Sequence, residues 1–394
     1  MDSLIHLARQ EGAYLSAVRR ELHRHPELAL REYRTASVIE RELDAAGIPH
    51  SRVGETSVLG TLEGSGTGPV IGLRADIDAL PIQEETGADY RSETDGVMHA
   101  CGHDVHTACL LGAAKLLARH RDAFPGQVRL LFQSAEETGG GAMDFVVAGV
   151  LSGVERVFGL HVAPDLPQGT VGLKPGLNNA AVDHFLIKIH GRAAHVSTPH
   201  LGADALYAAS QLVVAIQGIA ARRTSPVEPV ILGVGKLSAG TTYNAVAEYA
   251  EMEGTTRTVS QEARLAVRER IDEAACHIAA VSGAEAEVIW TGICSSLVND
   301  PTACVEAGDT ARTLGFAVTD SRPLSLGGDN FSEYLYQVPG CYAYLGTGNP
   351  AYPNTLAGIH NGRFDIDEAV LPMGAALYAA CALRWLTGGT VETV

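Results

Sequence analysis

The order of apolar and polar positions along the first 180 residues predicts an α/β fold. Short apolar runs, typical of buried strands, alternate with stretches that have helical spacing. Strands are expected at Val58–Leu62, Pro69–Asp76, Val128–Phe132 and Arg156–His161. Helices are expected over Ser3–His25 as one element, over Tyr33–Ala46, after Asp104, and between Gly141 and Gly149. This alternation favours a largely parallel sheet.

Near Ala181 the pattern changes to strand, helix, strand, strand, helix and strand, which is the ferredoxin-like order. The expected elements are Phe185–Gly191, Ala203–Ala221, Val230–Val234, Ala247–Thr256, Gln261–Ser282 and Glu285–Trp290. Helix and strand alternation resumes from about Val298. We therefore expect a discontinuous main domain, residues 1–181 and 295–394, into which a ferredoxin-like α+β domain, residues 182–294, is inserted.

Composition narrows the class of protein. The chain has 394 residues, of which 46% are apolar, enough for a large core. Its net charge is −17 and it has no basic cluster, so nucleic acid and anionic membranes are poor partners. The apolar stretch Leu206–Ala221 is too short and polar for a membrane span and is interpreted as a buried helix.

Two further features predict a cytoplasmic location. The N-terminus has no basic start followed by an apolar run, so no signal peptide is expected. The seven cysteines are odd in number and widely spread, which favours a reducing compartment over a disulfide framework.

The densest chemistry lies between His99 and His106, where eight residues contain one thiol, three imidazoles and a carboxylate. Cys101 and His103 can reach one metal ion if the backbone turns between them, and Gly102 permits that turn. Helical spacing begins just afterwards, so both ligands would lie on a loop that opens a helix. The alternative is a polar helix cap without a metal.

Other candidate ligands follow the predicted strands. Glu136 and Glu137 come just after one strand, His161 ends another, and His360 lies in a loop near the far end of the chain. Ligands in open α/β sheets bind beyond the carboxyl ends of the strands, so these groups are expected at one edge. Cysteine, histidine and glutamate suit Zn²⁺ or a similar borderline ion.

The adjacent pair Glu136 and Glu137 has two interpretations. A metal would relieve the repulsion by binding one carboxylate, and the other would then be placed to act as a general base. The alternative is the solvated first turn of a helix, where carboxylates favour the helix dipole.

Several ordered segments together resemble the M20 metallopeptidases, specifically their amidohydrolase branch. This branch includes hippurate hydrolases, N-acyl-amino-acid hydrolases and plant auxin–amino acid conjugate hydrolases. The matching segments, which extend over nearly the whole chain, are Leu22–Leu28, Leu73–Pro81, Met98–Thr107, Gln133–Glu137, Gly159–His161 and Ile359–Asn361.

The resemblance implies a site with two divalent ions that share Cys101. One ion would also be bound by Glu137 and His360, and the other by His103 and His161. Glu136 would be the general base. Zinc is favoured by the donor set, although manganese, cobalt and nickel stay open. Asp76 would orient an imidazole from behind the ligands, or would be a buried strand-end aspartate bonded to backbone amides.

By the same resemblance, the inserted domain is a lid and dimerisation domain, so a homodimer or homotetramer is expected. His195 would stabilise the oxyanion, and Asn244 and Arg257 would hold a substrate carboxylate. The chain departs from the family at Ala193–Ala194, where glycines are usual, and at Asp329–Asn330, where Glu-Asp is usual.

The predicted activity is metal-dependent hydrolysis of the amide bond in small-molecule N-acyl amino acids, through a water activated by two metal ions. Alternatives are a dipeptidase or carboxypeptidase with the same site, and a catalytically silent metal- or ligand-binding module. A binding module would not need Glu136 as a base. A purely structural zinc site usually closes with four ligands, fewer than the candidates here.

Overall fold

A computed structural model describes residues 3–389 of the chain. Its contacts divide the chain into two compact units. The first contains the chain up to Gly176, Val298–Pro323, and the chain from Asn330 onward, while the second contains Leu177–Leu297 and Leu324–Asp329. The predicted insert, residues 182–294, falls within the second unit.

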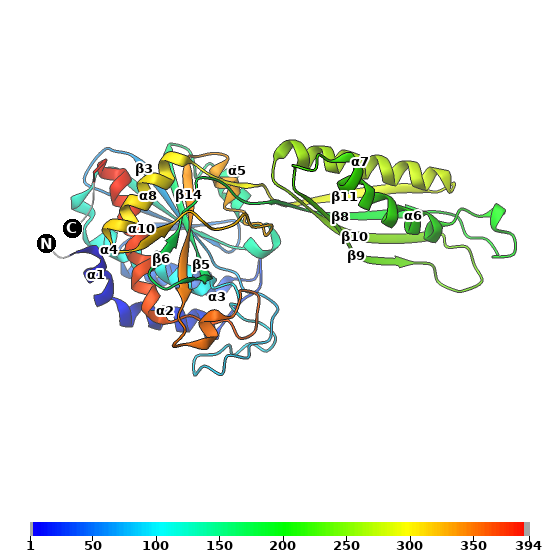
Figure 1. Cartoon of the computed structure of the whole chain (residues 1–394). Helices are drawn as coiled ribbons and strands as arrows, with labels where there is room; N and C mark the ends of the chain where they lie inside the picture. Colours follow the sequence, from blue (N-terminus) through cyan, green and yellow to red (C-terminus); the bar gives the residue numbers. More distant parts are fainter. Residues whose placement is uncertain (1–2, 390–394) are drawn as a thin grey trace. The chain divides into compact units, whose positions relative to one another are not determined.

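The first unit is built around an eight-stranded sheet whose centre is parallel (Figure 1). The strand order is β1-β2-β4-β3-β5-β14-β6-β13. Strands β4, β3, β5 and β14 run parallel, whereas β1, β2 and β6 each pair antiparallel with a neighbour. The bounds are β1 (His50–Val53), β2 (Ser57–Glu63), β3 (Val70–Asp76), β4 (Gln127–Gln133), β5 (Val154–Pro167), β6 (Thr170–Gly172), β13 (Ala317–Thr319) and β14 (Gly340–Gly348).

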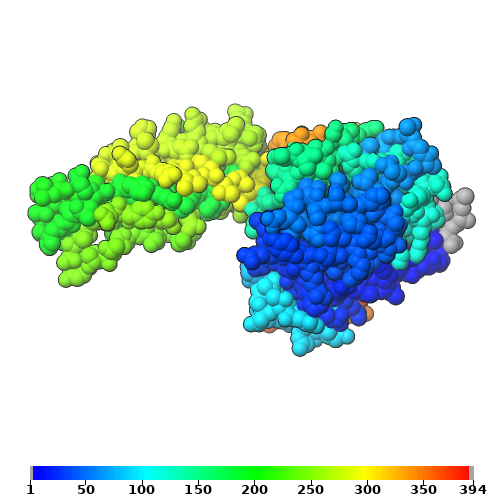
Figure 2. Space-filling model, turned by 180° about the vertical axis from the view of Figure 1, so that it is seen from behind, coloured from blue at the N-terminus to red at the C-terminus, as the bar shows by residue number. Residues whose placement is uncertain are grey.

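Helices surround this sheet, and α4 and α10 pack on each other within the main core. The bounds are α1 (Leu4–Gln10), α2 (Gly12–Arg24), α3 (Tyr33–Ala45), α4 (His103–Arg119), α5 (Ala142–Val147), α8 (Pro301–Thr313), α9 (Ser332–Leu335) and α10 (Leu371–Thr387). Nearly every side chain of α4 is buried, including the polar side chains of its first turns, so this helix lies within the core. From behind, the N-terminal part of the chain forms much of the first unit's surface (Figure 2).

The second unit has the predicted ferredoxin-like topology. Its four strands are antiparallel in the order β11-β8-β10-β9, and two helices pack on one face. The bounds are β8 (Ala181–His190), α6 (Ala205–Gly218), β9 (Val230–Ala239), β10 (Tyr249–Thr258), α7 (Gln261–Val281) and β11 (Glu285–Cys294). Short strands β7 (Gly176–Asn179) and β12 (Leu297–Asn299) form a separate two-stranded sheet.

Two predictions about single helices were wrong, and short strands such as β1 were missed. The first helix is interrupted at Glu11, whose carboxylate binds Lys115 and Arg119 of α4. Strand β1 was missed because its four residues show no apolar run. Helix α6 is not a buried helix, because Leu206, Tyr207 and Val214 are exposed.

By length and hydropathy alone, two helical segments of the described chain, Ala205–Arg223 and Glu368–Thr387, could cross a membrane. The second segment lies mostly inside the protein, with 78% of its most apolar stretch buried, as is typical of a core helix. For the first segment the buried share is 33%. Core helices of soluble proteins can have the same length and hydropathy, so these two properties are weak support for a membrane span.

Candidate metal centre

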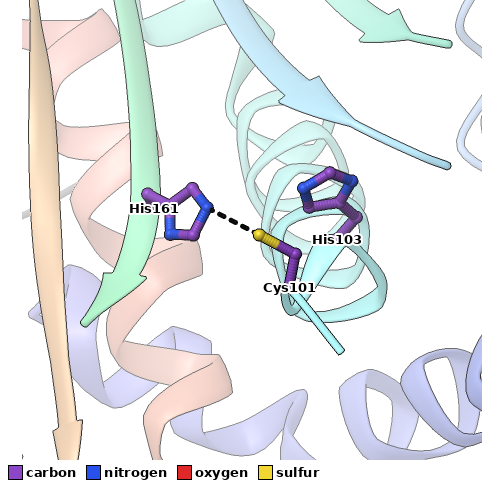
Figure 3. Close-up of side chains that lie close together, drawn as sticks. All are labelled: Cys101, His103 and His161. Atoms are coloured by element: carbon purple, nitrogen blue, oxygen red, sulfur yellow. Dashed lines mark hydrogen bonds between the residues drawn. The ribbon is translucent and has the colours of Figure 1, made fainter. Parts of the chain in front are cut away.

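The predicted ligand loop forms as the sequence indicated. Helix α4 begins at His103, and Gly102 just before it has a left-handed φ of +83°. A Cβ at Gly102 would lie 2.6 Å from a Val162 methyl carbon, so glycine is needed both for its conformation and for its size. The turn directs the Cys101 thiol toward His161 of β5, with 3.3 Å between Sγ and Nε2 (Figure 3).

The neighbouring strands bring the other groups to the same edge of the sheet. Asp76 is the last residue of β3, and Glu136 and Glu137 lie in a short 3₁₀ turn three residues beyond β4. His161 lies inside β5 rather than at its end, because this strand continues to Pro167. Since β4, β3 and β5 are adjacent and parallel, these side chains converge.

Two groups of possible ligands share one thiol. The ligand atoms of Cys101, His103 and His161 lie within 4.8 Å of one another, and so do those of Cys101, Glu137 and His360. His360 Nε2 is 3.4 Å from a Glu137 carboxylate oxygen. The structure therefore brings together all five residues that the sequence suggested as metal ligands.

The ring nitrogens of His103 test whether this cluster fits a metal. Nδ1 lies 3.2 Å from Asp78 Oδ1, whereas Nε2 is buried and has no hydrogen-bond partner in the described chain. The second oxygen of Asp78 accepts a hydrogen bond from the backbone N–H of Glu137. A histidine bound to a carboxylate through one nitrogen and left open at the other is typical of a metal ligand. The donor set and this unpaired nitrogen fit a divalent ion.

The titration behaviour of the cluster points the same way. Burial and then the nearby His106 hold the pKa of His161 well below its usual range, and its Nδ1 donates to the carbonyl of Val162. The neutral ring thus presents the Nε2 lone pair toward Cys101. Burial and the Glu137 carboxylate raise the pKa of the Cys101 thiol well above its usual value. A bound cation is the group that would favour the thiolate there.

His103 itself is influenced by opposing effects. Burial alone would lower its pKa, but the Asp76 carboxylate and the Cys101 sulfur raise it well above the usual value. Because metal ligands must be deprotonated, metal and protons would compete for this imidazole.

Asp76 supports the site indirectly. Its oxygens accept hydrogen bonds from His106 Nδ1 at 2.5 Å and from Arg74 at 2.6 Å. Burial alone would raise the pKa of this carboxyl group, but the nearby His103 and Arg74 outweigh burial and hold the pKa well below its usual range. The imidazole that it orients is His106, whose Nε2 accepts from the backbone N–H of Val162. Since both nitrogens of His106 are occupied, it is a support for β5 rather than a ligand. Within residues 3–389, no described hydrogen bond joins the Asp76 carboxylate to a backbone amide, which was the alternative.

Asn330, where the family usually has an aspartate, lies beside Glu136. The backbone N–H of Asn330 lies 3.3 Å from a Glu136 carboxylate oxygen. Its side-chain amide donates to the carbonyl of Gly140 and accepts from Gln133 and Arg74. An aspartate could not make the bond to Gly140 without a proton, so the amide at this position matches its surroundings.

The remaining predicted site residues belong to the second unit. His195 pairs with Ala245 in an isolated bridge, and its Nδ1 lies 2.7 Å from the Ser197 hydroxyl. The carbonyl of Asn244 accepts from the backbone N–H of Val196, so Asn244 lies beside the His195 segment. Arg257 lies on β10, and within residues 3–389 no described hydrogen bond joins it to the other two.

Sequence reasoning missed Asp78, Gln133 and Arg74 as parts of the site. The only signal for Asp78 was its place two residues beyond Asp76. His106 could be read only as a flanking residue, because its role depends on β5 passing the start of α4. Gln133 and Arg74 face each other from β4 and β3, a contact that exists only once the strands pair.

Comparison with known proteins agrees with this geometry. The sequence profile of Peptidase family M20/M25/M40 matches residues 72–384. The chain belongs to this family. It is accordingly a hydrolase that acts on amide bonds, and its mixed α/β unit and separate antiparallel unit match solved M20 structures.

Relatives within the family differ in the substrates that their names state. N-acetyl-L-cysteine deacetylase of Bacillus subtilis is 42% identical over 91% of this chain and 84% of that relative. Thermostable carboxypeptidase 1 of Saccharolobus solfataricus is 36% identical over 98% of each chain. The crystal structure of Bacillus subtilis YxeP, described as a dinuclear metal-binding M20 peptidase, is 38% identical with a TM-score of 0.81, covering 96% of this chain and 99% of that one.

Proposed function

We propose that this protein is a metal-dependent amidohydrolase that releases an amino acid and a carboxylic acid from an N-acyl amino acid. One observation carries the proposal: two ligand groups share Cys101, and Glu136 lies next to the Glu137 ligand. The resemblance to a deacetylase of acylated cysteine supports an acyl substrate.

The residues that would hold two divalent ions are those of the two groups. Cys101 would bridge, with His103 and His161 on one ion and Glu137 and His360 on the other. When bound, the ions would polarise the scissile carbonyl and lower the pKa of the attacking water. The thiolate and imidazoles favour zinc, and manganese, cobalt or nickel would also fit.

Glu136 then has the task of moving a proton. Its carboxylate would accept the proton of the attacking water and donate it to the amine nitrogen that leaves. Asn330 holds one of its oxygens, which limits the directions that the carboxylate can face. Glu137 would be committed to a metal ion and could not take this role.

The second unit would recognise the substrate. We assign the oxyanion contact to His195 and the substrate carboxylate to Asn244 and Arg257, because a guanidinium fork suits a carboxylate. We also propose a homodimer or homotetramer in the cytoplasm. The exposed apolar side chains of α6 support self-association.

A carboxypeptidase with the same site is the second candidate, favoured by the similarity to thermostable carboxypeptidase 1. Hydrolysis of a panel distinguishes the two: N-acetyl and N-benzoyl amino acids, dipeptides, and N-acyl amines that lack the carboxylate. We expect chelator-sensitive release from the acyl amino acids and little from the acyl amines. Faster turnover of dipeptides would favour the carboxypeptidase, and turnover that survives complete chelation would contradict both.

A further inference from the structure

The buried guanidinium of Arg19 joins two segments that are far apart in the sequence. Arg19 lies on α2 and its side chain is 1% exposed. Its Nε donates to Asp104 at 2.8 Å, and its Nη2 donates to Asp365 at 2.8 Å. A buried arginine that pairs with two carboxylates in fixed directions holds them at a defined separation.

Both carboxylates lie next to candidate metal ligands. Asp104 directly follows His103 in the first turn of α4. Asp365 follows His360 by five residues in the loop that leads to α10. The ion pairs of Arg19 therefore connect the segment that carries Cys101 and His103 with the loop that carries His360.

The His360 loop needs such a connection. The side chain of His360 is 50% exposed, whereas Cys101, His103 and His161 are buried. Its backbone has a φ of +60°, a left-handed conformation that a residue with a side chain keeps only when its surroundings hold it. One backbone bond, from the N–H of His360 to the carbonyl of Ala100, links it directly to the ligand loop.

Further contacts keep the carboxylates in place. The second oxygen of Asp365 accepts from the Tyr90 hydroxyl, and the Tyr90 ring lies 4.7 Å from the guanidinium carbon of Arg19. Asp104 also binds His23 at 2.8 Å. This arrangement leaves the guanidinium little freedom to move, so the spacing between its partners is set.

We propose that Arg19 is a positioning residue for the metal centre: by bridging Asp104 and Asp365 it fixes His360 against Cys101 and His103. The proposal rests on the proposed function, because His360 acts there as a ligand. Arg19 is not among the candidate metal ligands, so its effect is on the geometry of the ligands.

Two variants separate the parts of the bridge. Asp365→Ala removes the contact of Arg19 with the His360 loop, together with the hydrogen bonds that Asp365 accepts from Tyr90 and from the backbone N–H of Ile366, and it leaves the Arg19–Asp104 pair intact. Arg19→Met removes the contacts with both Asp104 and Asp365. Asp365→Asn keeps an acceptor for Arg19 and serves as the conservative variant. The matched control is Arg264→Met, which removes a largely buried arginine, 10% exposed, that pairs through two bonds with Asp183 in the second unit.

Hydrogen exchange of the metal-free protein gives a readout that requires neither metal nor substrate. Asp365→Ala is expected to speed exchange in the 358–364 segment, including the His360 amide, without affecting the amides of α4. Arg264→Met is expected to leave this segment unchanged. Unchanged exchange of residues 358–364 in Asp365→Ala would overturn the proposal, even if Arg19→Met does not fold.

Metal titration gives the second readout. The loss of a contact that supports a metal ligand typically lowers the metal affinity by about 10–100-fold. With Co²⁺ as the probe, Asp365→Ala is expected to weaken the second equivalent by at least about tenfold while the first keeps its affinity and its thiolate charge-transfer band. Asp365→Asn should restore most of the loss. Two equivalents of wild-type affinity in Asp365→Ala would overturn the proposal. If the wild type bound no metal, the proposed function would fail, and the exchange experiment would still judge the role of Arg19.

Discussion

At the level of single residues, the two adjacent glutamates have different partners. Glu137 lies between His103 and His360, with its backbone N–H bound to Asp78. One oxygen of Glu136 accepts a hydrogen bond from the backbone N–H of Asn330, and its carboxylate lies within 4.8 Å of the ligand atoms of Glu137 and His103. One short segment can therefore supply both a metal ligand and a proton carrier.

Changing Glu136 tests that division. Glu136→Gln should bind metal as the wild type does and lose about 10²–10⁴-fold in kcat, because the amide cannot accept the proton. The matched variant Glu137→Gln should weaken metal binding instead. Metal analysis and steady-state kinetics on both variants check this. Near-normal turnover in Glu136→Gln would remove it as the base.

His99 is expected to make the free energy of unfolding depend on pH. Burial lowers its pKa to about 3, and neither ring nitrogen has a hydrogen-bond partner in the described chain. Between pH 6.5 and 3 the unfolded chain binds a proton that the folded chain does not, so stability falls as the pH falls. From pH 7 to pH 5 this group alone should cost about 2 kcal/mol.

His99→Leu should therefore reduce the loss of stability between pH 7 and pH 5 by about 2 kcal/mol. Urea unfolding of the metal-free protein at both pH values measures it, with His6→Leu, an exposed histidine, as the control. An unchanged pH dependence in His99→Leu would show that the buried ring is not responsible.

At the element scale, the start of α4 determines where Cys101 lies. Gly102→Ala would put a Cβ against Val162 and force an alanine into a left-handed conformation. We expect a loss of at least about 1–2 kcal/mol in stability and weaker metal binding, since the thiol must shift. The control is Gly149→Ala, which also has positive φ but meets no atom within 4 Å. Equal effects in both variants would leave only backbone strain as the cause.

The elements also show what sequence reasoning can predict. The long strands and helices followed from periodicity, and the cluster from Cys101 to His103 followed from contiguous residues that suit a metal. The break at Glu11 could not be predicted, because it goes with ion pairs to α4, about a hundred residues away. The links from Arg19 to Asp104 and Asp365 were missed for the same reason, since long-range contacts leave no periodic signal.

At the scale of the whole molecule, the two units have separate hydrophobic cores. One core includes α4, α10 and the central strands, and the other includes Phe185, Leu212 and Val267. All five candidate ligands belong to the first unit. A ligand that binds only the folded form stabilises the part that binds it.

Metal should therefore protect the units unequally. At free metal about 100 times its dissociation constant, the first unit should gain about 2.7 kcal/mol. Hydrogen exchange with and without metal should show slower exchange in α4 and β5 and little change in β8 and β10. Equal protection of both units would mean that they unfold together.

Hydrolysis of an acyl amino acid should require both Glu136 and two ions bound around Cys101. The most direct test is to add metal stepwise to the metal-free protein while measuring turnover of an N-acyl amino acid, with Glu136→Gln and Cys101→Ala in parallel. Activity should rise until two equivalents per chain are bound, Glu136→Gln should bind both equivalents without turnover, and Cys101→Ala should lose affinity for both. Full turnover without metal, or undiminished binding and turnover in Cys101→Ala, would rule out this dinuclear site as the catalytic centre.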